Sequence, residues 1–220
     1  MREADIKKYF SEFIATFFLV FIGTGAVAVS ATGGTQIGLI GVAFTFGIAI
    51  FVLVNMFGKI SGANMNPAVT LALYVSRKIT LSDALFYIVM QCAGAICASM
   101  LICHLLPETP TFGETLPSIT KERAIFVESI ATFFIMFAIV LSFRNQDLEN
   151  KLPSVLGAIV FLDIMVFGPL TGASMNPART LGPAIVSGNY TDISIYIIGP
   201  IFGALLAVFV GYILHPRNHD

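Results

Sequence analysis

The sequence predicts an all-α integral membrane protein, with six transmembrane helices and two re-entrant half-helices in a 3+3 inverted repeat. Three observations support this: an apolar composition, long segments without charge, and an internal duplication. Hydrophobic residues make up 56% of the 220 residues, and charged residues only 11%. A soluble domain carries roughly 25% charged residues, so this chain could not cover a soluble surface. We expect one domain over residues 1–220, with repeats at about 6–106 and 122–214.

Segments without charge locate the predicted spans. No Asp, Glu, Lys or Arg occurs in residues 13–58, 84–107 or 193–216. A spanning helix needs about 20 predominantly apolar residues, so the first segment holds two helices and each of the others holds one. Two further apolar stretches complete the set. The six predicted spans are Tyr9–Val29, Ile37–Met56, Ala84–Leu106, Ala124–Phe143, Pro153–Val166 and Ile193–Leu214.

The connections between these spans are predicted to be short. The first two spans are expected to turn at Thr32-Gly33-Gly34. The fifth span is expected to be short and to end at Gly168-Pro169, because Pro cannot continue a helix without losing a hydrogen bond. The links Pro107–Thr120 and Arg144–Pro153 are interpreted as ordinary loops.

Lys and Arg are divided unequally between the two sides. The first span follows three basic residues, as a signal peptide does, but its pattern recurs inside the chain, so we expect it to be retained. With the N-terminus inside, nine Lys or Arg residues lie on one side and only Lys121 and Arg123 on the other. Cytoplasmic loops carry the excess of Lys and Arg. The sequence therefore predicts a multi-pass protein of the cell membrane with both termini in the cytoplasm.

An internal duplication relates the two halves of the chain. Residues 12–21 match residues 128–137 at seven of ten positions, and residues 61–68 resemble residues 171–178. Tyr87 and Gly94-Ala95 match Tyr196 and Gly203-Ala204 in the same order. Each half has three spans, an odd number, so the halves must cross the bilayer in opposite senses. Inverted repeats of this kind place the functional site at their interface near the midplane.

The motifs Asn66-Pro67-Ala68 and Asn176-Pro177-Ala178 each begin a predicted half-helix. Asn is a favourable N-cap, and Pro suits the first helical position. About ten residues follow each Asn, which gives a helix of about 15 Å, half a bilayer. Two such helices would meet at the midplane with their positive dipole ends. Irregular backbone at that depth needs protein or a watery cavity around it, so the pattern favours a pore over two surface loops.

The paired motifs, with Ser61-Gly-Ala before the first and Arg179 after the second, resemble the aquaporin/glycerol-facilitator (major intrinsic protein) family. The second half is similar to plant nodulin-type intrinsic proteins and their prokaryotic and archaeal relatives. The resemblance implies a homotetramer with a pore through each subunit. It also implies passive flow of water and small uncharged solutes, with protons and ions excluded by the helix dipoles and by Arg179. Such a channel needs no cofactor and no metal.

The resemblance also places the selectivity filter on Phe46, Ile164, Ala173 and Arg179. Strict water channels of the family have His at the Ile164 position, and glycerol facilitators have Asp directly after the Arg, where this chain has Thr180. The set matches neither group. Without an imidazole donor, the ring should be wider and more apolar than a water-only filter, so we expect water plus a small polar neutral solute. Plain core packing of Phe46 remains an alternative.

Three carboxylates lie in apolar surroundings. Glu12 and Glu128 occupy equivalent repeat positions. An ionisable residue inside a membrane is a functional candidate by default, and proton transport is the sharpest form of that hypothesis. The resemblance implies instead that both support the Asn-Pro-Ala loops by accepting backbone N–H groups. Asp163 has no repeat counterpart, because the offset of 110 gives Leu53, and its role stays open between a pore-facing acceptor and a helix–helix partner.

Other functions are less compatible with the sequence. A net charge of −1 does not suit a nucleic-acid binder, and no nucleophile–base set, phosphate loop or metal cluster indicates an enzyme. Within the channel class, the main cargo could be glycerol, ammonia or an undissociated metalloid acid. Inverted repeats also occur in ion-coupled secondary transporters, but the Asn-Pro-Ala tips carry no titratable group. An adhesion role between membranes ranks lowest, because the predicted loops are short.

Overall fold

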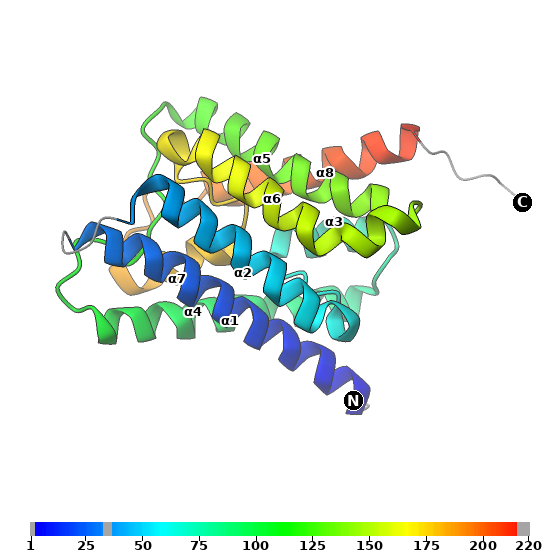
Figure 1. Cartoon of the computed structure of the whole chain (residues 1–220), viewed down its shortest axis with the longest axis horizontal. Coiled ribbons are helices and arrows are strands. Elements are labelled where there is room, and N and C mark those ends of the chain that lie inside the picture. The colour runs from blue at the N-terminus through cyan, green and yellow to red at the C-terminus, as the bar shows by residue number, and fades with distance from the viewer. Residues whose placement is uncertain (1–2, 33–36, 215–220) are drawn as a thin grey trace, which may run out of the picture.

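The computed structural model describes residues 3–32 and 37–214, and within them it forms eight helices (Figure 1). Six are long and two are short. Their bounds are α1 (Glu3–Ala31), α2 (Gly38–Ser61), α3 (Pro67–Val75), α4 (Leu81–Leu105), α5 (Lys121–Ser142), α6 (Gln146–Thr171), α7 (Pro177–Ser187) and α8 (Ile195–Leu214). The six long helices fall on the six predicted spans, and α3 and α7 are the two predicted half-helices. The predicted turn at Gly33-Gly34 lies outside the described residues.

The prediction for the fifth span was wrong in length. Helix α6 has 26 residues, begins at Gln146 and contains both Pro153 and Pro169. Asn145 caps its start by accepting a hydrogen bond from the Leu148 N–H (3.1 Å). Each Pro removes only one hydrogen bond, and the two lie near opposite ends of the helix. The link Arg144–Pro153 is therefore mostly helical, and its charged first two turns extend the helix beyond its apolar stretch.

Helices α2 and α6 cross where the two repeats meet. Gly47 and Gly157 occupy equivalent repeat positions, 110 residues apart. A Cβ added to Gly47 would lie 2.8 Å from the Gly157 carbonyl oxygen, and one added to Gly157 would lie 2.7 Å from the Gly47 carbonyl oxygen. Each helix thus approaches the other through a residue without a side chain, as membrane helices commonly do. The near-identical distances indicate a pseudo-twofold axis at this crossing.

The same symmetry governs the other close helix pairs. Helix α1 packs against α4, and α5 packs against α8. Gly94 of α4 lies directly against the Phe13 carbonyl of α1, and its counterpart Gly203 of α8 lies against the Ser129 carbonyl of α5. Gly residues in these two helix pairs let the paired backbones approach closely. The centre of the molecule is thereby left for α3 and α7.

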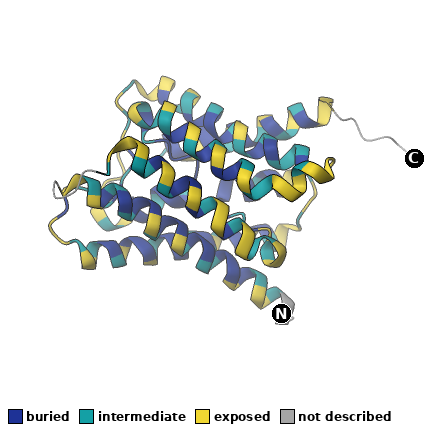
Figure 2. Cartoon of the chain, viewed as in Figure 1, coloured by how far each residue is buried: buried dark blue, intermediate teal, exposed yellow. Residues whose placement is uncertain are grey.

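Large hydrophobic side chains are exposed on the outer faces of the helices, where Figure 2 marks exposed residues in yellow. Phe44, Val89, Phe126 and Phe209 are each at least 60% exposed. Within the described residues, six helices of 20 to 27 residues are long and apolar enough to cross a membrane. Such a surface would be costly in water and is favourable in lipid, where the hydrocarbon core spans about 30 Å.

Candidate functional site

The two Asn-Pro-Ala motifs begin the half-helices as their sequence predicts. Asn66 and Asn176 have extended backbones, with φ of −153° and −152°. The Asn66 side-chain oxygen accepts from the Ala68 N–H (2.9 Å), and the Asn176 oxygen accepts from the Ala178 N–H (3.0 Å). Pro at the first helical position fixes φ in advance. Both side chains are therefore held at the positive end of a helix dipole.

Each of these Asn side chains also donates to the opposite loop. Asn66 Nδ2 donates to the Met175 carbonyl (2.7 Å), and Asn176 Nδ2 donates to the Met65 carbonyl (2.7 Å). These reciprocal bonds join the tips of α3 and α7. An amide group carries two N–H hydrogens, so one hydrogen of each Asn is left to donate to a solute.

In the loops that precede the two motifs, four residues other than Gly adopt a left-handed backbone. Ala63 and Met65 have φ of 48° and 51°, and their counterparts Ala173 and Met175 have φ of 45° and 56°. This conformation costs about 1–3 kcal/mol for a residue with a side chain, and it persists only where surrounding contacts hold it. The loops are therefore strained, and the strain recurs at the same positions in both repeats.

Glu12 supplies those contacts in the first repeat. Its carboxylate accepts the backbone N–H groups of Asn64 and Met65, each at 2.9 Å. It also accepts the Ser61 hydroxyl (2.6 Å) and the Gln91 amide (2.7 Å). Glu12 is fully buried, and a buried charge is tolerated only when its hydrogen bonds are satisfied.

Glu128 occupies the matching position in the second repeat. It accepts the backbone N–H groups of Ser174 (2.9 Å) and Met175 (2.7 Å) and the Thr171 hydroxyl (2.7 Å). A tyrosine braces each loop from behind: Tyr87 donates to the Ser61 carbonyl (2.8 Å) and Tyr196 to the Thr171 carbonyl (2.7 Å). Both loops are thus held by the same kinds of contact.

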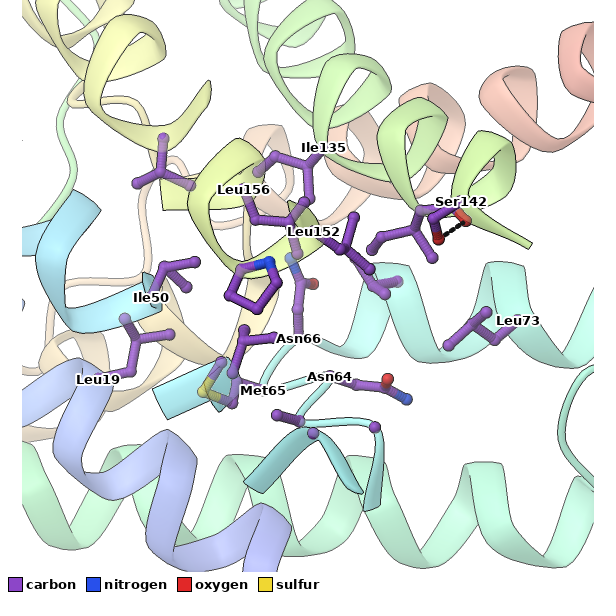
Figure 3. A pocket seen from close by; sticks show the side chains of 18 of the residues that line it. Leu19, Ile50, Asn64, Met65, Asn66, Leu73, Ile135, Ser142, Leu152 and Leu156 are labelled. Atoms are coloured by element: carbon purple, nitrogen blue, oxygen red, sulfur yellow. Dashed lines mark hydrogen bonds between the residues drawn. The ribbon is translucent and has the colours of Figure 1, made fainter. Parts of the chain in front are cut away.

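A cavity of about 640 Å³ reaches the joined tips from one end of the helix bundle. Figure 3 shows Leu19, Ile50, Ile135 and Leu156 around Asn66 in its wall. Both motif Asn side chains line it. Its mouth is lined by the charged residues Lys59, Lys78 and Glu149. The cavity is therefore a mostly apolar passage with hydrogen-bond donors at its inner end.

Phe46, Ala173 and Arg179 of the predicted filter all line this cavity. The Arg179 guanidinium carbon lies 5.4 Å from the centre of the Phe46 ring. Arg179 Nη1 donates to the Gly113 carbonyl (2.5 Å), and its buried Nε has no hydrogen-bond partner among residues 3–32 and 37–214. Phe46 also fills the space over Gly23, where an added Cβ would meet its ring. Phe46 thus both packs and lines the cavity.

Ile164 is placed differently from the other three. It is buried, at 4% exposure, in the same hydrophobic cluster as Phe46 and Ala173. It is not one of the described residues that line the cavity. Asp163, its neighbour, is 5% exposed, and its Oδ2 atom has no hydrogen-bond partner in the described part of the chain. Its role as a pore-facing acceptor or helix partner stays open.

The loop between α4 and α5 was interpreted as ordinary, and that interpretation was wrong. Gly113 has a positive φ of 84° and packs tightly against Thr24 of α1. Its carbonyl accepts from Arg179, and Thr115 two residues later contacts the Thr180 hydroxyl (2.9 Å). The loop has no repeat counterpart because it joins the two halves, so the duplication could not mark it. Gly113 and three Pro residues were the turn signals in this segment, but none of them indicates which distant residues it contacts.

Comparisons with known proteins agree with this geometry. The family model described as "Major intrinsic protein" matches residues 2–211. The chain is 39% identical to aquaporin NIP1-1 of Zea mays over 97% of this chain and 76% of that protein. It is 37% identical to nodulin-26 of Glycine max over 93% of this chain and 76% of that protein. The X-ray structure of the aquaglyceroporin from Plasmodium falciparum matches with a TM-score of 0.84 and 26% identity, over 96% and 98% of the two chains.

Proposed function

Since the chain belongs to the major intrinsic protein family, we propose that it is a passive transmembrane channel for water and small uncharged solutes. The predicted fold of six spans and two re-entrant half-helices is confirmed by the helices and by the aquaglyceroporin structure that resembles them. One observation carries the proposal: two Asn side chains, tied to each other's loops, offer donors at the inner end of an apolar cavity.

The proposed mechanism follows from those donors. A water molecule that accepts from both Asn66 and Asn176 points its own hydrogens away from them, which interrupts a chain of water-to-water hydrogen bonds. The two helix N-termini add positive potential at the same place. Protons and cations are therefore repelled, while neutral molecules pass. No step consumes energy or needs a bound cofactor.

Arg179 is proposed as the second barrier. Its proposed partners in the filter are Phe46 and Ala173, which line the cavity, and Ile164, which lies in the same hydrophobic cluster as these two. The guanidinium is held by the Gly113 carbonyl, so its remaining donors can replace the water around an entering solute. Phe46, Ala173 and Ile164 are aromatic or aliphatic, and this suits a solute that has a carbon backbone as well as hydroxyl groups. This composition supports glycerol, or another small neutral solute such as ammonia or an undissociated metalloid acid, as a second cargo beside water.

Proton-coupled transport is the main competing function. Coupling needs a carboxylate that changes its protonation during transport. Glu12 and Glu128 both have their oxygens occupied by backbone N–H and hydroxyl donors, and both are fully buried. Their arrangement supports a fixed structural role.

We also propose a homotetramer in the cell membrane with both termini in the cytoplasm.

Proteoliposomes in stopped-flow light scattering provide the test. With an impermeant osmolyte, we expect the protein to accelerate osmotic shrinkage relative to empty liposomes, at a rate that does not depend on pH or sodium gradients. A glycerol gradient then measures the second cargo by the rate of re-swelling. Water flux equal to that of empty liposomes would contradict the channel, and a rate that follows the proton gradient would favour coupled transport.

A further inference from the structure

Gly23 of α1 lies directly against the ring of Phe46. A Cβ added to Gly23 would lie within 3.0 Å of three ring carbons, namely Cδ1, Cε1 and Cζ. Carbon atoms in favourable contact are about 3.5–4.0 Å apart, so even one methyl group at this position would displace the ring. Gly23 is buried and is not one of the described residues that line the cavity. Because Gly23 has no side chain, the ring can lie against α1.

The second repeat has residues of different sizes at the equivalent positions. The offset of 116 relates Gly23 to Ile139, and the offset of 110 relates Phe46 to Leu156. A very small and a very large residue in the first repeat thus correspond to two residues of intermediate size in the second. Ile139 and Leu156 both line the cavity, whereas of the first pair only Phe46 does. Gly23 and Phe46 therefore differ from their counterparts together, as two residues in contact would.

The Phe46 ring has little room to move except towards the passage. Phe46 is 6% exposed and belongs to a cluster of buried hydrophobic residues. Such clusters contain few voids larger than a water molecule, and the cavity that Phe46 lines is the open space beside the ring. The Arg179 guanidinium carbon lies 5.4 Å from the ring centre. A group that pushed the ring away from α1 would therefore move it into the passage beside Arg179.

We propose that Gly23 is a specificity-determining residue, which leaves room for the Phe46 ring against α1 and thereby sets the size of the largest solute that passes. Gly23 has no side chain that could contact a solute, so it acts through Phe46. A larger residue at this position should exclude solutes in the order of their size. The proposal rests on the channel function proposed above.

Gly25→Ala is a matched control for Gly23→Ala. Both variants change Gly to Ala in α1, but for a Cβ added to Gly25 the nearest atom of another helix is Ile102 Cδ1, at 3.9 Å, which is an ordinary contact. Ala is also more favourable than Gly in a helix, so neither change should weaken α1 itself.

Stopped-flow scattering on proteoliposomes measures the permeabilities to water, urea and glycerol, and thermal unfolding in detergent measures stability. We expect Gly23→Ala to lower glycerol permeability about tenfold and water permeability by no more than about twofold, because a narrower passage raises the barrier most for the largest solute. Urea should fall between these two. Gly25→Ala should keep all three permeabilities at the wild-type values.

Phe46→Leu supplies the second half of the test, because it removes the ring and introduces the residue of the second repeat. In that background Gly23→Ala should no longer lower glycerol permeability, so the two changes should be non-additive. If Gly23→Ala does not assemble, Gly23→Ile/Phe46→Leu tests the same contact with the residue pair of the second repeat. This double variant should assemble and conduct, whereas Gly23→Ile alone should not.

Four outcomes would each overturn the proposal: wild-type permeabilities in Gly23→Ala, an equal loss for all three solutes, the same effect in Gly25→Ala, or an undiminished effect in the Phe46→Leu background. Failure of Gly23→Ile/Phe46→Leu to assemble better than Gly23→Ile would do so as well. A wild type without flux would contradict the channel function and this proposal together, whereas any of the other outcomes in a conducting wild type would contradict this proposal alone.

Discussion

The two re-entrant loops are held alike but meet different surroundings. In both repeats a buried Glu accepts two backbone N–H groups, a Tyr donates to a loop carbonyl, and a Thr follows the motif four residues after its Asn. The residues that face the passage differ. Arg179 in the second repeat corresponds to Val69 in the first, and Phe46 corresponds to Leu156. All four line the cavity.

This difference distinguishes the residues that hold the loops from those proposed to select among solutes. The residues that hold the loops are duplicated because strained backbone must be held wherever it occurs. The residues that we propose to discriminate among solutes occur once, because one constriction in series is enough to limit passage. Variants at duplicated positions should therefore act on stability in both halves, and variants at the differing positions should act on permeation.

The largest effect is expected at the duplicated carboxylates. Glu12→Gln or Glu128→Gln turns one acceptor oxygen into an NH₂ group that faces a backbone N–H or a hydroxyl donor. Leaving a buried donor unpaired costs about 1–3 kcal/mol, and more beside a charged partner, so we expect each variant to lose about 3 kcal/mol of stability or to fail to assemble. Thermal unfolding in detergent measures the loss.

Glu122→Gln is the matched control, because Glu122 lies on the same helix as Glu128 but is exposed. It should unfold at the wild-type temperature. Loss of stability in only one of Glu12→Gln and Glu128→Gln would show that the two halves are not held alike, which would break the comparison.

Arg179→Val gives the second repeat the residue that the first repeat has at Val69. We expect it to lower stability less than the Glu12 and Glu128 variants do, and to change permeation more. The variant removes both the hydrogen-bond donors and the positive charge that line the cavity beside Phe46. We expect the glycerol-to-water ratio to rise about tenfold, which corresponds to about 1.4 kcal/mol in relative barrier height, and proton leakage to appear.

Stopped-flow scattering and a pH-sensitive dye inside the liposomes measure these changes. Val69→Ala tests the equivalent position of the first repeat and should alter neither proton leakage nor the ratio by more than about twofold, since it changes no charge. If Val69→Ala affects selectivity as strongly as Arg179→Val, the equivalent positions of the two repeats would share in selection.

Much of the fold could be predicted because its determinants are local or repeated. Long segments without charged residues predicted the membrane spans, and Asn followed by Pro predicted where α3 and α7 begin. The first two turns of α6 were missed because their stability comes from the Asn145 cap and from continuity with an apolar helix, neither of which is visible as hydropathy. The contacts of Gly113 and Thr115 were missed because they join residues about 65 apart in a segment without a counterpart.

The smallest effect, and the sharpest test of the comparison, is expected at Asp163. Leu53, which the offset of 110 gives, is a buried apolar residue at 4% exposure, whereas Asp163 buries an oxygen with no partner in the described part of the chain. If Asp163 contributes only packing, Asp163→Leu should remove a desolvation cost and raise stability by about 1 kcal/mol, without changing the glycerol-to-water ratio. The reverse change, Leu53→Asp, should lower stability by several times as much, since it buries a second unpaired carboxyl. Thermal unfolding of both variants, together with their permeabilities, decides the role. An Asp163→Leu variant of wild-type stability or higher whose selectivity is altered would instead make Asp163 a third residue, beside Phe46 and Arg179, that differs between the repeats and acts on selection.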